Sequence, residues 1–338
     1  MLVVALLGVA GATVASGQVG RIMGAGPSPT PSATPTPTST PTATRTPSPR
    51  PTPEPPPPPV SPAAAPCATA VTMSVWAHYD DDLIFANPVL QDAMASGECV
   101  RTVFVTASDA GRGMGYSQGR ELGILRAYNT MRGQEGFWSE NRVTLLSGAE
   151  LSQFSPDGDP DVTIAFLRLP DGNLNGDGFS ATGHAALPKL LSGVIADLAP
   201  VTGAPALSSE GLVLTLAELI QAYDATRLFT HVPSDSAEWS AGDHPDHAAT
   251  GTYARAAWQR AGFPAGQVLY AIGYPTASLP ANVGGDVLSQ KIAAFRTYAA
   301  QDSVVTCATD AACLAKPRFG EWLQRTYLKS EPELFPAD

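Results

Sequence analysis

The chain has 338 residues and a formal net charge of −11, with only 20 lysines and arginines. This balance argues against binding to nucleic acid, whose phosphates demand clustered positive charge, and no basic stripe suits anionic lipid. The length allows two domains, but the first fifth lacks the composition of a core, so we expect one folded domain of about 270 residues.

The composition divides the chain into three regions. Residues 1–24 begin with an almost wholly apolar stretch followed by small residues, which predicts either a signal peptide or an uncleaved N-terminal anchor. Residues 25–66 are dominated by Pro, Thr, Ser and Ala and predict a disordered linker, extended as a stalk. Residues 67–338 form the predicted domain. We expect an exported protein, extracellular or at the cell surface, with membrane contact only through its first region.

Strands and helices alternate along the predicted domain. The expected strands cover residues 71–76, 100–106, 142–146, 162–169, 227–231 and 267–274. The expected helices cover residues 82–96, 117–133, 184–198, 212–223, 248–261 and 287–300. This alternation predicts an α/β fold, a three-layer α/β/α sandwich around a Rossmann-like, mainly parallel sheet.

Four cysteines lie outside the first two regions, and an even count in an exported protein favours disulfides. Cys67 shortly precedes the first predicted strand, and Cys99 immediately precedes the second. If these strands are parallel neighbours, both cysteines lie at the same end of the sheet. We therefore predict a disulfide between Cys67 and Cys99 and, by default, a second between Cys307 and Cys313.

Two loops have features of known binding loops. Residues 108–119 are rich in glycine but lack the Walker lysine pattern, so we interpret them as a mobile rim of an active site. Residues 171–177 match the first half of a calcium loop, but Thr182 stands where the bidentate carboxylate should be. A calcium site and an Asx-rich turn both remain possible there, and the turn is favoured.

Two clusters of histidine and aspartate follow predicted strands. The first is Ala77-His78-Tyr79-Asp80-Asp81-Asp82, and the second is Asp243-His244-Pro245-Asp246-His247. A parallel sheet brings both clusters to one edge, and two imidazoles with a carboxylate make a divalent metal site with open positions. One of the extra carboxylates would then act as a general base. His184 and His231 lack acidic neighbours, and we expect them to be structural.

The two clusters together resemble the PIG-L/LmbE-like N-deacetylases, the family of the N-acetylglucosaminyl-phosphatidylinositol and mycothiol-pathway deacetylases. The motifs of that family are Ala-His-Pro-Asp-Asp-Glu and His-Pro-Asp-His. The resemblance covers about residues 72–301, including Gly-Arg-Glu at 119–121, Arg-Leu-Pro-Asp-Gly at 168–172 and a helix with Lys291, Tyr298 and Gln301. It implies an LmbE-like fold and a zinc-dependent deacetylase.

The resemblance also implies a role for each matching residue. His78, Asp81 and His247 would be the metal ligands, for Zn²⁺ or another divalent ion such as Fe²⁺, and Asp80 would be the general base. Only neutral histidines and ionised carboxylates bind such an ion, which agrees with these residue types.

The neighbouring residues receive supporting roles from the same resemblance. His244 would stabilise the oxyanion or protonate the leaving amine, with Asp246 orienting it from behind, and Arg120 would hold substrate. Two positions depart from the family motif, because Tyr79 replaces its proline and Asp82 replaces its glutamate. We expect metal binding to survive both changes, but a supporting role of that glutamate is in doubt.

These observations predict a hydrolase that removes an N-acetyl group from an amino sugar or glycoconjugate, with no protein partner. Two other functions stay open. A non-haem iron oxygenase uses the same two histidines and one carboxylate, although usually on a β-barrel. A non-catalytic glycan-binding module would use the metal only as a structural element, but it would have no use for Asp80.

Overall fold

The fold is built on a mixed β-sheet. The computed structural model describes residues 59–336, and within them eight strands form one sheet in the order β10-β9-β8-β1-β2-β5-β4-β3. The run from β9 through β8, β1 and β2 to β5 is parallel, and the pairs β10·β9, β5·β4 and β4·β3 are antiparallel. The strands are β1 (Val71–Trp76), β2 (Cys99–Thr106), β3 (Trp138–Thr144), β4 (Glu150–Pro156), β5 (Val162–Leu169), β8 (Arg227–His231), β9 (Val268–Ala271) and β10 (Leu328–Ser330).

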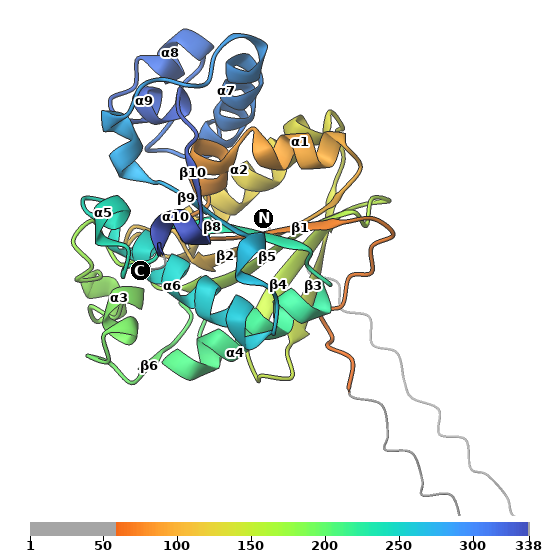
Figure 1. Cartoon of the computed structure of the whole chain (residues 1–338), viewed down its shortest axis with the longest axis vertical. Helices are drawn as coiled ribbons and strands as arrows, with labels where there is room; N and C mark the ends of the chain where they lie inside the picture. Colours follow the sequence, from red (N-terminus) through yellow and green to blue (C-terminus); the bar gives the residue numbers. More distant parts are fainter. Residues whose placement is uncertain (1–58, 337–338) are drawn as a thin grey trace, which may run out of the picture. The chain divides into compact units, whose positions relative to one another are not determined.

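Helices cover both faces of this sheet (Figure 1). One face carries α1 (Val89–Ala95), α2 (Met114–Arg132) and α7 (Gly285–Ala299), and the other carries α4 (Ser209–Ala222) and α6 (Pro245–Arg260). Two separate apolar clusters fill the spaces between the layers. Every residue of β1 and β2 is buried, as expected for central parallel strands covered on both faces. The predicted three-layer α/β/α sandwich with a mainly parallel sheet is confirmed.

Short elements complete the described part of the chain. They are the π-helix η1 (Asp82–Ala86), the 3₁₀ helices η2 (Ser180–Thr182), η3 (Ala265–Gln267) and η4 (Tyr274–Ser278), the helices α3 (Leu187–Leu191), α5 (Ala237–Ser240), α8 (Asp310–Leu314), α9 (Phe319–Leu323) and α10 (Glu331–Leu334), and the small hairpin of β6 (Asp197–Leu198) and β7 (Leu207–Ser208).

Two predicted helices are wrong in extent. The helix expected over residues 82–96 is divided into η1 and α1, because Pro88 has no N–H to continue the ladder and favours the extended conformation seen at Asn87. The helix expected over residues 184–198 is only α3, which ends before Gly193 with its positive φ of 73°. Strand β4 was not predicted, because Ser152, Gln153 and Ser155 interrupt its apolar pattern, yet it pairs with strands on both sides.

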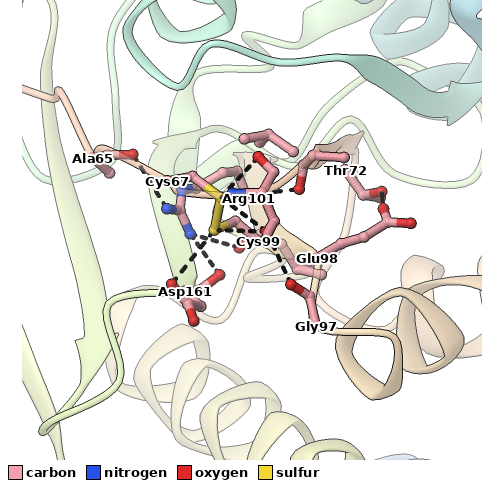
Figure 2. The surroundings of a disulfide bond; sticks show 12 residues. Ala65, Cys67, Thr72, Gly97, Glu98, Cys99, Arg101 and Asp161 are labelled. Atoms are coloured by element: carbon pink, nitrogen blue, oxygen red, sulfur yellow. Dashed lines mark hydrogen bonds between the residues drawn. A yellow bond between two sulfur atoms is a disulfide. The ribbon is translucent and has the colours of Figure 1, made fainter.

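Both predicted disulfides, Cys67–Cys99 and Cys307–Cys313, are confirmed. Cys99 pairs in register with Val71, so the first disulfide lies at the edge of the sheet where β1 and β2 begin. Figure 2 shows the fully buried Arg101 beside it, donating to the carbonyl oxygens of Asp161 at 2.6 Å and Ala65 at 3.2 Å. Carbonyl acceptors therefore replace a carboxylate partner for this guanidinium.

The end of the Pro-rich region contacts the folded body. Ser61 donates from its hydroxyl to Glu218 at 2.6 Å, and Ala63 is fully buried in the apolar cluster under α4 and α6. The predicted N-terminal segment, residues 1–24, and most of the predicted linker lie outside the described residues. No helix in the described part of the chain is long and apolar enough to cross a membrane.

Candidate active site

Polar side chains from three elements meet at the carboxyl edge of the sheet. Residues 77–82 directly follow β1, His231 ends β8, and His244 is the N-cap of α6. Strands β1 and β8 are parallel neighbours, so their ends lie side by side. Three overlapping groups of described residues have donor atoms close enough to hold a metal ion, namely His78, His244 and His247, then His78, Asp171, His244 and Asp246, and finally Asp81, His231 and His247.

The three residues predicted as metal ligands lie against one another. His78 Nδ1 is 3.2 Å from His247 Nε2, and Asp81 is 3.3 Å from His78 Nδ1 and 3.0 Å from His247 Nε2. All three side chains are buried. Two imidazole nitrogens and a carboxylate within 3.3 Å of one another are the kind of donor set that hydrolytic zinc sites use, although the three groups above place His78 and Asp81 in separate sets, each with His247.

The charges of the surrounding side chains favour a cation between His78, Asp81 and His247. Burial alone would lower the pKa of His247, but Asp81 and Asp243 outweigh it and raise that pKa to about 9. The pKa of His78 is also raised despite burial, chiefly by Asp81. Two imidazolium ions 3.2 Å apart would repel each other, whereas one divalent cation satisfies the carboxylates and leaves both imidazoles neutral. The residues therefore fit a metal ion.

Two further carboxylates determine which ring nitrogens face that point. Asp243 Oδ1 lies 2.8 Å from His247 Nδ1, so a neutral His247 donates from Nδ1 and has its lone pair on Nε2. Asp246 Oδ2 lies 3.3 Å from His78 Nε2, which leaves Nδ1 of that ring free in the same way. Such outer hydrogen bonds usually orient metal-binding histidines. The contact of Asp243 was not predicted, although its position directly before the His-Pro-Asp-His sequence was an available signal.

The interpretation of His231 as a residue with no acidic company is wrong. Its Nε2 lies 3.1 Å from Asp81, and its ring stacks on that of His247 with centroids 4.0 Å apart. Burial lowers the pKa of His231 to about 4, so the imidazole is neutral. The available signal was its place at the end of a buried strand, but the pairing of that strand with β1 was not visible in the sequence.

Asp80, the predicted general base, is paired with Arg120. Arg120 Nη2 donates to Asp80 Oδ1 at 2.9 Å, and its Nη1 donates to the Ser108 carbonyl at 2.7 Å. Its Nε lies 2.5 Å from the Tyr298 hydroxyl and 3.1 Å from Asp302. Burial raises the pKa of Asp80, although Arg120 opposes this change. Arg120 thus holds the carboxylate in place, and its predicted contact with substrate stays a prediction.

The imidazole of His244 is neutral, and its hydrogen-bond donor is the Nε2–H group. Burial, together with repulsion from His78 and His247, lowers its pKa well below the ordinary value. Its Nδ1 accepts from the backbone N–H of Asp246 at 3.1 Å, so the proton is on Nε2. The carboxylate of Asp246 is 3.9 Å from His244 Nδ1 but 3.3 Å from His78, and it accepts from the Gly172 N–H at 2.7 Å. The predicted support of His244 by that carboxylate therefore stays a prediction.

A cavity of about 460 Å³ opens onto these residues. Its lining includes polar residues of this cluster together with apolar and aromatic residues, namely His78, Asp80, Asp81, Arg120, His244, Phe85, Leu174, Phe179, Tyr274, Phe319 and Trp322. Residues 171–177 contribute to one wall. There Asp171, Asn173 and Asn175 each accept from a nearby backbone N–H, which is the hydrogen bonding of an Asx-rich turn.

Comparison with known proteins identifies the family. The family model described as PIG-L, GlcNAc-PI de-N-acetylase, matches residues 73–258, more than half of the chain. No curated protein matches.

Similar solved structures include the conserved protein TT1542 from Thermus thermophilus, with 18% identity, 77% of this chain and 92% of that chain covered, and a TM-score of 0.41. Another is a triple mutant of a deacetylase involved in the teicoplanin biosynthetic pathway, with 16% identity, coverage of 76% and 89%, and a TM-score of 0.43. A third is the A40926 pseudoaglycone deacetylase Dbv21, with 16% identity, coverage of 69% and 83%, and a TM-score of 0.40. On the extent of the family-model match, the chain belongs to the PIG-L family.

Proposed function

We propose that this protein is a metal-dependent hydrolase that removes an N-acetyl group from an amino sugar or glycoconjugate. The observation that carries this proposal is the cluster of two imidazoles and one carboxylate, within 3.3 Å of one another, beside a buried carboxylate held by an arginine. Membership of the PIG-L family supports N-deacetylation over other hydrolyses.

His78, Asp81 and His247 would hold the metal, which we propose to be Zn²⁺, with Fe²⁺ as the other divalent ion that this donor set suits. When bound, the metal would supply Lewis acidity toward the amide carbonyl and would acidify water. Asp243 and Asp246 would keep the two imidazoles in the tautomers that bind it, since each accepts from the outer ring nitrogen.

The protein's own side chains would perform the proton transfers. Asp80 would take a proton from the attacking water, and Arg120 would keep its carboxylate directed at the cavity. The Nε2–H of His244 would donate to the oxygen of the amide carbonyl as negative charge develops there. The proton removed from water would finally reach the nitrogen as the C–N bond breaks, releasing a free amine and acetic acid, which then ionises.

We further propose that the protein is exported. Two disulfides lie within the described residues, and such bonds persist in oxidising compartments. The predicted N-terminal segment and Pro-rich linker agree with a catalytic domain held on a stalk outside the cell. Cell fractionation with a non-reducing gel of the extracellular fraction tests this, because a reduced protein in the cytoplasm would contradict it.

The test of activity is amine release from N-acetylated mono- and oligosaccharides, with and without a chelator. Asp80→Ala should keep its metal and lose about 10²- to 10⁴-fold in turnover, the usual contribution of a general base. His78→Ala and His247→Ala should lose the metal, measured as metal content after purification. Asp286→Ala, which removes an exposed carboxylate on α7, is the matched control. Full activity in Asp80→Ala would exclude the mechanism, and activity that requires oxygen would favour an iron oxygenase.

A further inference from the structure

The cavity above the proposed metal site has two cationic side chains at its wall that the mechanism does not use. Arg112 comes from the glycine-rich loop before α2, and Arg318 comes from the turn before α9. Both residues line the cavity, and both are exposed. They therefore face the space where a substrate would lie.

Neither guanidinium has an acceptor within the described part of the chain. No carboxylate there forms an ion pair with either, and neither side chain donates a hydrogen bond; among the described arginines only Arg126 shares this property. The guanidinium carbon of Arg112 lies over the ring of Tyr116, 5.1 Å from its centroid. That ring is fixed in turn, because the Tyr116 hydroxyl donates to Asp302 at 2.9 Å. The ring thus supports Arg112 from one side and leaves its donors free.

Arg318 is held in a strained backbone conformation. Its φ is 70° and its ψ is −56°, and the Phe319 N–H donates to the Pro317 carbonyl at 2.9 Å, which makes a γ-turn with positive φ. This turn is rare and costs a residue other than glycine about 1–3 kcal/mol. Strain of this kind is concentrated at functional sites, where the position of a side chain matters more than the stability of the turn.

The segment that carries Arg318 is built onto the cavity by several contacts. Asp302 accepts from the Val304 and Val305 N–H groups at 2.8 and 3.2 Å, and the Cys307–Cys313 disulfide closes the following loop. Val304, Val305, Phe319 and Trp322 from the same segment line the cavity. This segment lies beyond residues 73–258, so the cavity wall that it forms is not part of the stretch that matches the family model.

We propose that Arg112 and Arg318 together bind an anionic group carried by the substrate, a carboxylate or a phosphate on the sugar whose N-acetyl group is removed. This inference rests on the proposed function. Guanidinium groups match the oxygens of both anions with paired N–H donors. Two guanidinium groups without a carboxylate partner also provide a local attraction for an anion in a protein whose net charge is −11.

The experiment compares three substrates with the metal-loaded protein: N-acetylglucosamine, N-acetylmuramic acid, which adds a carboxylate, and N-acetylglucosamine 6-phosphate. The wild type should have a higher kcat/KM for at least one charged sugar than for the neutral sugar. Arg112→Gln and Arg318→Gln should each reduce this preference about tenfold, mainly through KM, as expected for the loss of a charge-assisted hydrogen bond. The charged sugar that is preferred identifies the anion.

Arg260→Gln is the matched control. It removes the same charge from an exposed arginine, which pairs with Glu210 on the face of the sheet opposite α2. Calorimetric binding of the charged sugars to the metal-loaded protein gives a second readout that does not require turnover. Hydrolysis of the neutral sugar without any preference would overturn this inference and leave the proposed function intact. Binding of a charged sugar that both arginine variants weaken, with no amine release from any sugar, would support the anion site and overturn the proposed function. An equal loss in Arg260→Gln would overturn the anion site.

Discussion

Asp243→Asn separates the charge behind the metal site from the hydrogen bonds that hold the site together. Asp243 Oδ1 accepts three hydrogen bonds, from the His244 N–H at 2.8 Å, the Tyr274 N–H at 3.0 Å and His247 Nδ1 at 2.8 Å. The carbonyl oxygen of asparagine can occupy the position of Oδ1 and keep all three. The substitution therefore removes the negative charge, but it also places an amide NH₂ at the position of Oδ2, which is buried and has no hydrogen-bond partner among the described residues.

The expected result is a loss of about 10- to 100-fold in Zn²⁺ affinity, the usual effect of changing a carboxylate behind a metal-binding histidine. This corresponds to about 1.4–2.7 kcal/mol of binding free energy. Asp243→Ala should behave differently, because three buried donors lose their acceptor at about 1–3 kcal/mol each, so the protein should also lose thermal stability.

The assay is competition with a chromophoric chelator, combined with thermal unfolding of the metal-free protein. Asp286→Asn on α7 is the control for loss of one carboxylate charge: it should leave the Zn²⁺ affinity unchanged and cost at most about 0.3–1 kcal/mol of stability, because Asp286 lies in the first turn of the helix. Unchanged Zn²⁺ affinity in Asp243→Asn would refute the reasoning, since it would mean that His247 does not bind the metal through the nitrogen opposite Asp243.

Two further predictions concern stability. Replacing both cysteines of Cys67–Cys99 by serine should lower the free energy of unfolding by about 4 kcal/mol, and replacing those of Cys307–Cys313 should lower it by about 2 kcal/mol, because the first disulfide closes a longer loop. Denaturant unfolding that ranks the two losses in the opposite order would contradict this. Lys291 is fully buried, and burial lowers its pKa well below the ordinary value. At pH values between that lowered pKa and about 10.4, Lys291 is protonated in the unfolded chain but neutral in the folded protein. Over this pH range the free energy of unfolding should therefore increase by up to about 1.4 kcal/mol per pH unit. Lys291→Met should lack this increase. Denaturant unfolding that gives the same slope of unfolding free energy against pH for both proteins, between about pH 8 and 10, would refute the prediction.

The sequence predicted the part of the site that follows from strand ends. His78, Asp80 and Asp81 directly follow a buried apolar strand, and parallel pairing places such residues at one edge of the sheet. The His-Pro-Asp-His sequence could be connected with them through its resemblance to a known family. The alternation of strands and helices was sufficient for the fold class, and the places of Cys67 and Cys99 before two successive strands were sufficient for the first disulfide, whereas Cys307–Cys313 was predicted only because no other cysteines were left.

The remaining contacts depend on packing between distant elements. Asp302 reaches Arg120 and Tyr116 only because α7 lies against α2, and no local pattern indicates this pairing. The wall formed by Val304, Phe319 and Trp322 comes from short elements whose sequence has no clear period. Periodicity identifies long elements with one buried face, whereas short helices held by a disulfide and side-chain contacts leave little trace in the sequence.

Tyr79 and Asp82, the two departures from the family motif, are accommodated by helix α2. The Tyr79 hydroxyl donates to Glu121 at 3.0 Å, and the Tyr128 hydroxyl donates to Asp82 at 2.7 Å. Glu121 and Tyr128 are seven residues apart and so lie on one face of the helix. Burial raises the pKa of Asp82 to about 8, so this side chain is largely neutral at pH 7 and adds little charge beside Asp81. Within the described residues neither side chain hydrogen-bonds to His78, Asp81 or His247. Both substitutions therefore change the contacts of this loop with α2 and leave the proposed donor set as the family motif has it.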